Sequence, residues 1–416
     1  INIPIERMAT GRIVTGYFSH EVCFLPGDNY NIEIEADTIK FTGKGAEKNN
    51  FLYATEKNGT SDWSYYSFSN NGNLNPSDFL LTMKEFKQKR LDFIDTYPNK
   101  KLLEPEFINY YKLNTQVIYE YLIQSYPERY AYKSNIHPDS IDLPEEYSRL
   151  NQFTNIVDDR KIITGEYTSN LRNFIYKKRK EVMKADSSLN YQEAIYTVLF
   201  DSLQGKTQEY VLAKWICFEF SFNNYDTIAV KKYEEIEKDE LSKTTVKNAL
   251  DKYNMKQALI GQPLHPEFDE TMLEDTTNTK LTFGEMMDKY KGKVVYLDIW
   301  SLNCGPCRAS MPYSKELKER LTGLPIEFVY IAQDPPGNDV WKKIFNVSLT
   351  KDNHYRMVKH DWGTSRMLKF MEINWVPCYM IFDKQGHLID FNADGPYVSK
   401  NGVSGLEMKL KELANK

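Results

Sequence analysis

Cys304 and Cys307 are the two residues whose type and spacing point most directly to chemistry. They follow the apolar run 293–300, which is typical of a buried strand, and they open a segment at 306–321 that is predicted to be helical. The N-terminus of a helix presents unpaired N–H groups and a partial positive charge, which stabilise a thiolate. We therefore expect the pKa of Cys304 to lie below the value of about 8.5 that is usual for a free cysteine.

Cys307 lies one turn further along the same side of that helix, so its sulfur can reach Cys304 and close a disulfide. Together the two residues would be a nucleophile and its resolving thiol. A zinc site and two inert core cysteines are the alternatives. A structural zinc site usually needs two pairs of ligands, but the sequence has no second cysteine pair with this spacing and no histidine pair with finger spacing. This context favours redox chemistry.

The composition is that of a globular protein with more than one domain. The chain has 416 residues, of which 41% are apolar and 27% are charged, and its net charge is -5. This balance argues against a broad basic surface for nucleic acid, and no apolar run approaches the about 18 residues that span a bilayer. The chain starts at Ile1, so we expect a processed product whose signal or lipid anchor lies outside this sequence.

Hydrophobic periodicity predicts a multidomain α+β protein in three parts. Residues 1–60 are predicted to be a small β segment, because apolar and acidic residues alternate at 32–36. Residues 61–260 are predicted to be an irregular α-helical domain. Residues 261–416 alternate between strand and helix patterns, including a short helix at 339–345, and this order predicts an α/β sheet with flanking helices.

The last part resembles a thioredoxin-fold domain of the TlpA/ResA type, a family of thiol-disulfide oxidoreductases related to the AhpC/TSA redoxins. The segments that carry the resemblance are VVYLDIW at 294–300, CGPCRASMP at 304–312, WVPCYMIFD at 375–383 and KQGHL at 384–388. They are similar to the strand before the active site, the redox motif on its proline-kinked helix, the cis-proline loop, and the turn after it. The β and helical parts before them resemble the extensions of large cell-envelope thioredoxin-like lipoproteins.

The resemblance implies a role for Asp298, six residues before Cys304. Thioredoxin-like proteins carry a buried carboxylate there, and burial raises its pKa, so that it can accept or return a proton near neutral pH. The expected role is a proton relay to Cys307 through water. A hydrogen-bonded or solvated structural aspartate is the alternative.

The resemblance also implies a substrate-binding surface around the two cysteines. Its expected residues are Trp300, Gly305, Pro306, Val376 and Pro377. The peptide bond before the second of these prolines is expected to be cis. The backbone of the preceding valine would then be free to pair with an extended substrate segment.

Two residues depart from the family pattern. Cys378 follows the expected cis-proline where threonine is common, so it is either a third redox thiol or, as we favour, a small apolar residue of the core. Ser310 stands three residues after Cys307, where many relatives have a glutamate that tunes the thiols. Its presence leaves Asp298 as the one obvious acid–base group.

The sequence therefore predicts a thiol-disulfide oxidoreductase that acts on protein disulfides or dithiols, with no metal and no cofactor besides its own redox-active disulfide. By resemblance we expect a periplasmic or cell-envelope protein, with or without a lipid anchor. Two alternatives stay open, a peroxiredoxin-like peroxidase and a non-catalytic binding or assembly protein. The Pro-x-x-x-Thr-x-x-Cys setting of a peroxidatic cysteine is missing before Cys304.

Overall fold

The computed structural model describes residues 5–14, 19–35, 38–71, 74–150, 152–153, 156–334, 342, 353–359, 365–397 and 402–416. The chain divides into two compact units. The first comprises Ile1–Trp215 with Ile228–Ser242, and the second comprises Ile216–Thr227 with Lys243–Lys416. Apart from Lys342, the helix predicted at 339–345 lies outside the described residues.

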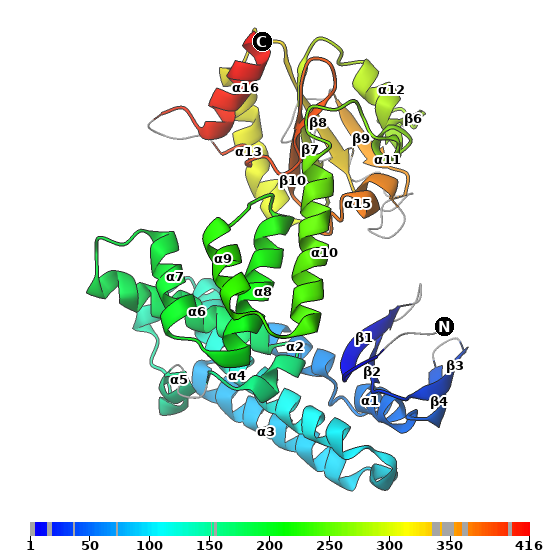
Figure 1. The fold of residues 1–416 in the computed structure, drawn as a ribbon, viewed down its shortest axis with the longest axis vertical. Coiled ribbons are helices and arrows are strands. Elements are labelled where there is room, and N and C mark those ends of the chain that lie inside the picture. The colour runs from blue at the N-terminus through cyan, green and yellow to red at the C-terminus, as the bar shows by residue number, and fades with distance from the viewer. Residues whose placement is uncertain are drawn as a thin grey trace. The chain divides into compact units, whose positions relative to one another are not determined.

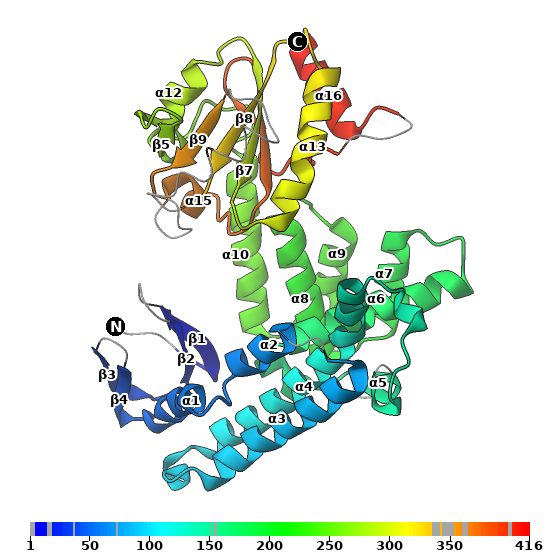
Figure 2. The same ribbon diagram turned by 180° about the vertical axis from the view of Figure 1, so that it is seen from behind.

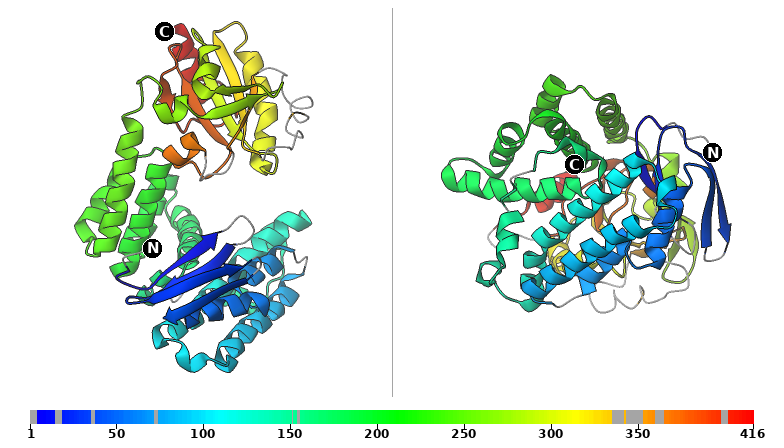
Figure 3. Two further views of the ribbon diagram at one scale, coloured as in Figure 1. Left: turned by 90° about the vertical axis from the view of Figure 1, so that its right-hand side faces the viewer. Right: turned by 90° about the horizontal axis from the view of Figure 1, so that it is seen from below.

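The first unit begins with two antiparallel β-hairpins and continues as helices (Figures 1 and 3). One hairpin pairs β1 (Ala9–Val14) with β2 (Ser19–Phe24), and the other pairs β3 (Asn29–Glu35) with β4 (Thr38–Lys44). The helices are α1 (Glu47–Lys57), α2 (Asp62–Asn71), α3 (Pro76–Thr96), α4 (Pro105–Ser134), α5 (Glu145–Leu150), α6 (Tyr167–Ala185), α7 (Tyr191–Asp201), most of α8 (Gly205–Ser221) and α9 (Thr227–Ile236). Three short 3-10 helices span Lys100–Leu102, Pro138–Ser140 and Asp159–Ile163.

The predicted fold class is confirmed, but the extent of the β segment is smaller than predicted. The strands end at Lys44, and α1 occupies residues 47–57, where the helix formers Glu, Lys, Leu and Ala supply six of the 11 residues. Its Phe51 is buried in an aromatic core with residues of α4. The alternation at 32–36 predicted the strand β3 correctly, although its Ile32 and Ile34 side chains are 41% and 46% exposed.

A buried ion pair lies among the tyrosines of this unit. Arg90 of α3 is 1% exposed and lies 2.6 Å from the carboxylate of Asp62. Its guanidinium is 5.5 Å from the ring centroid of Tyr65 and 4.7 Å from that of Tyr111. Burying an unpaired charge is costly. The carboxylate of Asp62 and the two tyrosine rings offset this cost, so Arg90 can be part of the core.

The second unit is built on a sheet whose described strands have the order β11-β10-β7-β8-β9-β5-β6. The central strands β7 (Val294–Trp300), β8 (Ile326–Ala332) and β9 (His354–Met357) are parallel. The antiparallel strands are β5 (Met272–Asp275), β6 (Lys280–Thr282), β10 (Cys378–Phe382) and β11 (Leu388–Asp390). The helices are α10 (Glu240–Gln257), α11 (Pro266–Asp269), α12 (Phe283–Asp288), α13 (Gly305–Arg320), α15 (Arg366–Phe370) and α16 (Gly405–Asn415).

Helices cover both faces of this sheet, as Figures 1 and 2 show. One face packs against α13 and α16, and the other packs against α11, α12 and α15. All seven residues of β7 are therefore buried, which explains why its sequence is a nearly continuous apolar run. Since α13 follows β7 after a short loop, the start of this helix lies at the carboxyl edge of the central strands.

The second unit includes α10, which precedes the predicted domain boundary at residue 261. Leu259 and Ile260, just after this helix, pack against the sheet core, and the N–H of Gly261 donates to the carbonyl of Leu388 at 2.8 Å. The assignment of three domains with boundaries at 60 and 260 stays a prediction. In the described part of the chain, no helix has the length and apolar character needed to cross a membrane.

We expect a fragment of residues 243–416 to be more stable than a fragment of residues 261–416. The shorter fragment loses Leu259 and Ile260 from the sheet core, and partial burial of two such side chains contributes about 2–4 kcal/mol to the free energy of unfolding. Urea unfolding followed by circular dichroism measures the difference. The double substitution Leu259→Ala with Ile260→Ala in the longer fragment should reproduce most of the loss, whereas equal stability of the two fragments would contradict this account.

Candidate active site

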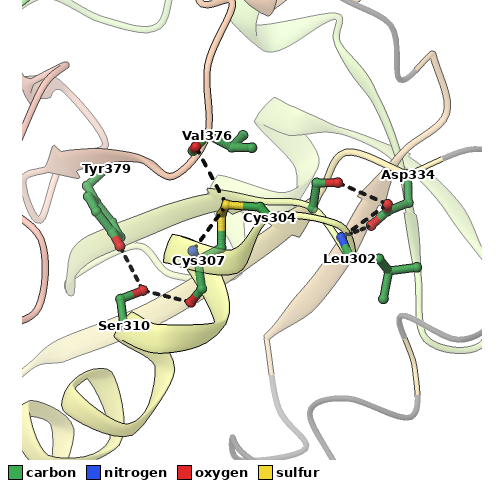
Figure 4. Close-up of a disulfide and its surroundings, with 8 residues drawn as sticks. Leu302, Cys304, Cys307, Ser310, Asp334, Val376 and Tyr379 are labelled. Carbon is green, nitrogen blue, oxygen red and sulfur yellow. Dashed lines mark hydrogen bonds between the residues drawn. A yellow bond between two sulfur atoms is a disulfide. The ribbon is translucent and has the colours of Figure 1, made fainter. Parts of the chain in front are cut away.

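The two cysteines form a disulfide at the start of α13 (Figure 4). Cys304 is the N-cap residue of this helix, and its sulfur accepts the backbone N–H of Cys307 at 3.1 Å. Pro306 occupies the first turn, where backbone N–H groups have no partner within the helix, so the N–H that proline lacks costs no hydrogen bond. The sulfur of Cys304 thus lies where the unpaired N–H groups and the positive end of the helix dipole favour negative charge.

The two sulfurs differ in their access to solvent. Cys307 is 1% exposed and belongs to the core beneath α13, whereas Cys304 is only partly buried. Gly305 and Pro306 are exposed between them, and a Cβ built on Gly305 would meet no atom within 4 Å. An incoming group therefore meets the sulfur of Cys304 first.

The loop before β10 lies directly beside this disulfide. The peptide bond between Val376 and Pro377 is cis, as predicted from the sequence. The carbonyl oxygen of Val376 is 3.6 Å from the sulfur of Cys304. Both residues are half-buried, so the loop and the disulfide are placed to share one surface. The structure thus brings together four of the five residues predicted for substrate binding.

Asp298 lies in the interior, on the α13 side of the sheet. Side chains alternate along a strand, so Asp298 shares a face of β7 with Tyr296 and Trp300, and these belong to the same core as Cys307. The carboxyl is 1% exposed, and neither oxygen has a hydrogen-bond partner among the described residues. Burial raises the pKa of Asp298 to about 8. This carboxyl is therefore suited to exchange a proton near neutral pH.

Ser310 and Tyr379 form a hydrogen-bonded link that the sequence did not predict. The Tyr379 hydroxyl donates to Ser310 Oγ at 2.9 Å, and Ser310 Oγ donates to the carbonyl oxygen of Cys307 at 2.8 Å. Both side chains are buried. Tyr379 also lies opposite Asp298 in the pairing of β10 with β7. The serine that replaces the expected glutamate thus ties the second cysteine to β10 instead of supplying a charge.

Asp334 holds the loop before Cys304. Its carboxylate accepts the backbone N–H of Leu302 at 3.1 and 3.2 Å and the hydroxyl of Ser301 at 3.2 Å. Asp334 was not among the predicted site residues, although its position in the sequence was a usable signal. Asp334 follows β8, which runs parallel to β7, and the carboxyl ends of parallel neighbours meet at one edge of a sheet.

Trp300 and Cys378 are placed differently from the other predicted residues. Trp300 is fully buried, so this structure gives its ring no contact with a substrate, and its place is in the core below the site. Cys378 is 2% exposed and packs in the core on the opposite face of the sheet from Cys307. Burial raises the pKa of Cys378 to about 12. This position supports the packing interpretation of Cys378 over a third redox thiol.

Among the described residues, no three His, Cys, Asp or Glu side chains are grouped so that they could hold a metal ion. The arrangement that the structure does present is an accessible sulfur, a buried partner sulfur, and a buried carboxyl on the same side of the sheet. These groups can carry out sulfur exchange together with proton transfer.

Comparison with known proteins finds similarity over the same segment. Residues 292–388 match the family model described as thioredoxin-like. No curated protein matches the chain.

Similar solved structures align with about a third of the chain. The thioredoxin domain of a thiol-disulfide oxidoreductase from Bacteroides vulgatus is 19% identical, with a TM-score of 0.28 over 35% of this chain and 92% of that one. A thiol:disulfide interchange protein from Bacteroides sp. is 18% identical, with a TM-score of 0.28 over 35% and 86%. The exposed lipoprotein thioredoxin of Streptococcus pneumoniae is 22% identical, with a TM-score of 0.25 over 34% and 98%.

The segment matched by the family model contains both cysteines, the buried Asp298 and the cis-proline loop. The fold around them is a central parallel sheet with helices on both faces, as the sequence predicted. Residues 292–388 are therefore thioredoxin-like.

Proposed function

We propose that the protein is a thiol-disulfide oxidoreductase that exchanges disulfides with partner proteins through Cys304 and Cys307. The observation that carries the proposal is the accessible sulfur of Cys304 at the start of α13, 3.6 Å from the carbonyl oxygen of Val376. An extended partner segment that pairs with the backbone of the loop before β10 would bring its own sulfur to Cys304.

In the reducing direction, the Cys304 thiolate attacks one sulfur of the partner disulfide. A bond forms between that sulfur and Cys304, and the other partner sulfur leaves as a thiolate. Cys307 then loses its proton and attacks the sulfur of Cys304. This step restores the disulfide between the two cysteines and releases the second partner thiolate, so that two electrons pass to the partner. The oxidising direction makes and breaks the same bonds in reverse.

Asp298 is the proposed proton acceptor for Cys307. Cys307 is buried, and Asp298 lies on the same face of the sheet without a hydrogen-bond partner among the described residues. A carboxyl whose pKa is raised to about 8 can take a proton from a thiol and return it in the reverse direction. Cys304 has less need of such a base, since the helix terminus favours its thiolate.

The proposed redox group is the disulfide itself, and the proposed partners are proteins that carry a disulfide or a dithiol. A cell-envelope location stays a prediction that rests on the family resemblance. In the described part of the chain, no observation favours a peroxidase or a purely structural role over exchange. The pairing of an accessible with a buried cysteine gives a resolving thiol next to the nucleophile, as exchange requires.

The variant Cys307→Ser should trap partners as mixed disulfides, whereas Cys304→Ser should trap none. Removal of the resolving thiol leaves the first bond intact, while removal of the nucleophile prevents that bond from forming. Non-reducing electrophoresis after acid quench measures the adducts. Cys378→Ala is the control and should cycle like the wild type, because its thiol lies on the other face of the sheet. More adducts with Cys304→Ser than with Cys307→Ser would reverse the two roles.

The variant Asp298→Asn should slow resolution more than the first attack. Loss of a positioned general base typically lowers a rate by about 100-fold to 10,000-fold. Stopped-flow reduction of a model disulfide, with the mixed disulfide quantified after acid quench, separates the two steps. Mixed disulfide should accumulate while the first rate stays close to that of the wild type. Equal slowing of both steps would assign Asp298 a structural role only.

Asp298 should also make the oxidised protein less stable as the pH rises from about 4 to about 8. With its pKa raised to about 8, the folded chain holds a proton at Asp298 that the unfolded chain, with an ordinary carboxyl pKa of about 3.9, releases. Unfolding then releases this proton, so the free energy of unfolding falls with pH in this range. Urea unfolding at about pH 5 and about pH 8 should show this fall in the wild type and a smaller one in Asp298→Asn. Parallel pH profiles would show that the carboxyl titrates normally.

A further inference from the structure

A pocket of about 840 Å³ lies in the second unit, next to the loop that carries the cis-proline. The end of α8, the part of α10 from Thr245 to Lys256, and the segment from α15 to Trp375 form its walls. Its volume falls within the range of about 300–1,000 Å³ that is typical of ligand sites. The reaction described above does not use this pocket.

Three aromatic side chains, Phe218, Phe222 and Trp375, form a continuous row along the pocket, which we call the aromatic ladder. The ring centroids of Phe218 and Phe222 are 4.6 Å apart, and those of Phe222 and Trp375 are 5.2 Å apart in a stacked arrangement. Phe218 is 55% exposed and Phe222 is 39% exposed. Contiguous exposed apolar groups with a polar rim are typical of interaction sites, so the ladder is suited to pack against an apolar group.

The charged groups of the pocket are mostly cationic. Lys252, Lys256 and Lys369 line it together with a single carboxylate, that of Glu372, which pairs with Lys252. Lys256 is 5% exposed, and burial lowers its pKa. A carboxylate of a ligand would complement this excess of positive charge and would stabilise the charged form of Lys256.

The aromatic ladder ends at the residue before the one that contacts the reactive sulfur. Trp375 directly precedes Val376, whose carbonyl oxygen is 3.6 Å from Cys304. A segment paired with the loop in extended form advances by about 3.3 Å per residue. A partner side chain a few residues from the exchanged cysteine would therefore reach the pocket while the sulfur of that cysteine stays at Cys304.

We propose that this pocket binds a segment of the partner polypeptide that carries an aromatic or large aliphatic side chain next to a carboxylate, close to the cysteine that is exchanged. The apolar side chain packs against the aromatic ladder, and the carboxylate faces Lys256. The proposal rests on the proposed function, because it selects among partners of that same exchange. It identifies α8 and α10 as part of the recognition surface.

The test uses the full-length chain and three reporter peptides of equal length, each with its cysteine in a mixed disulfide with a chromogenic thiol. A small dithiol supplies the electrons that reduce the Cys304–Cys307 disulfide again after each turnover, and its direct reaction with each peptide is subtracted. Three residues from the cysteine, the first peptide carries Phe-Glu, the second Phe-Lys and the third Ser-Glu. The value of kcat/KM for the first peptide should exceed the other two by about tenfold, the size typical of one well-placed side chain. Lys256→Gln should abolish the preference for Glu over Lys and keep that for Phe over Ser, and Phe222→Ser should do the opposite.

Two control variants match these substitutions outside the pocket. Lys247→Gln removes an exposed lysine of α10, and Trp63→Ser removes an aromatic side chain that is 70% exposed. Both should keep the preference of the wild type. Lys256→Arg retains the charge and should keep the preference for Glu. Thermal unfolding of each variant checks that it is folded. The comparison of the three peptides with the wild type tests the proposal even if a variant does not fold.

The outcomes separate this inference from the proposed function. If the wild type reduces a small aromatic disulfide but turns over all three peptides equally, the pocket proposal is wrong and the exchange function stands. If it reduces neither the small disulfide nor any peptide, the proposed function itself is wrong. Analytical sedimentation tests whether a second copy of the chain occupies the pocket instead. A dimer of the wild type that dissociates in Phe222→Ser would place a second copy of the chain on the ladder and would overturn the proposal.

Discussion

The antiparallel pairing of β10 with β7 is the constraint on which the rest of the site depends. Cys378 lies opposite Ile299, and Tyr379 lies opposite Asp298. Because β7 leads into Cys304 and β10 follows Pro377, this register alone brings two segments about seventy residues apart in the sequence to the same disulfide. A shift by one residue would exchange the faces of every side chain on β10. Tyr379 would then leave Ser310, and Cys378 would turn toward Cys307.

The same register places Cys378 and the redox pair on opposite faces of the sheet. On the α13 face lie Tyr379 and Cys307, which belong to one core, and the buried Asp298, which shares this face of the sheet. On the other face lies Cys378, close enough for the charge of Lys256 to lower its pKa against the stronger effect of burial. The side of the sheet that exchanges electrons is therefore distinct from the side that faces α10 and the aromatic ladder.

The sequence predicted those features that depend on local patterns. The apolar run before Cys304, the cysteine spacing and the Val376–Pro377 segment carried enough information to predict the strand, the helix start and the cis-proline. Trp300 was predicted to bind substrate but is buried, because the sequence next to a motif does not show whether an aromatic ring faces solvent or the core. Tyr379 and Ser310 were missed because their contact depends on pairing across the sheet. The aromatic ladder was missed for a similar reason, since Phe222 and Trp375 are far apart in the sequence and their rings meet only in the folded second unit.

The open space around Gly305 has a consequence for how such a site can diversify. A side chain at this position would meet no neighbouring atom within 4 Å, and Pro306 beside it is exposed. The two residues between the sulfurs can therefore change without repacking the core beneath them. Substitutions there act on the reactivity of the pair and on the fit to a partner, while the fold is held by residues on the other side of the helix. Adaptation of the chemistry and maintenance of the scaffold are thus assigned to separate positions of one short motif.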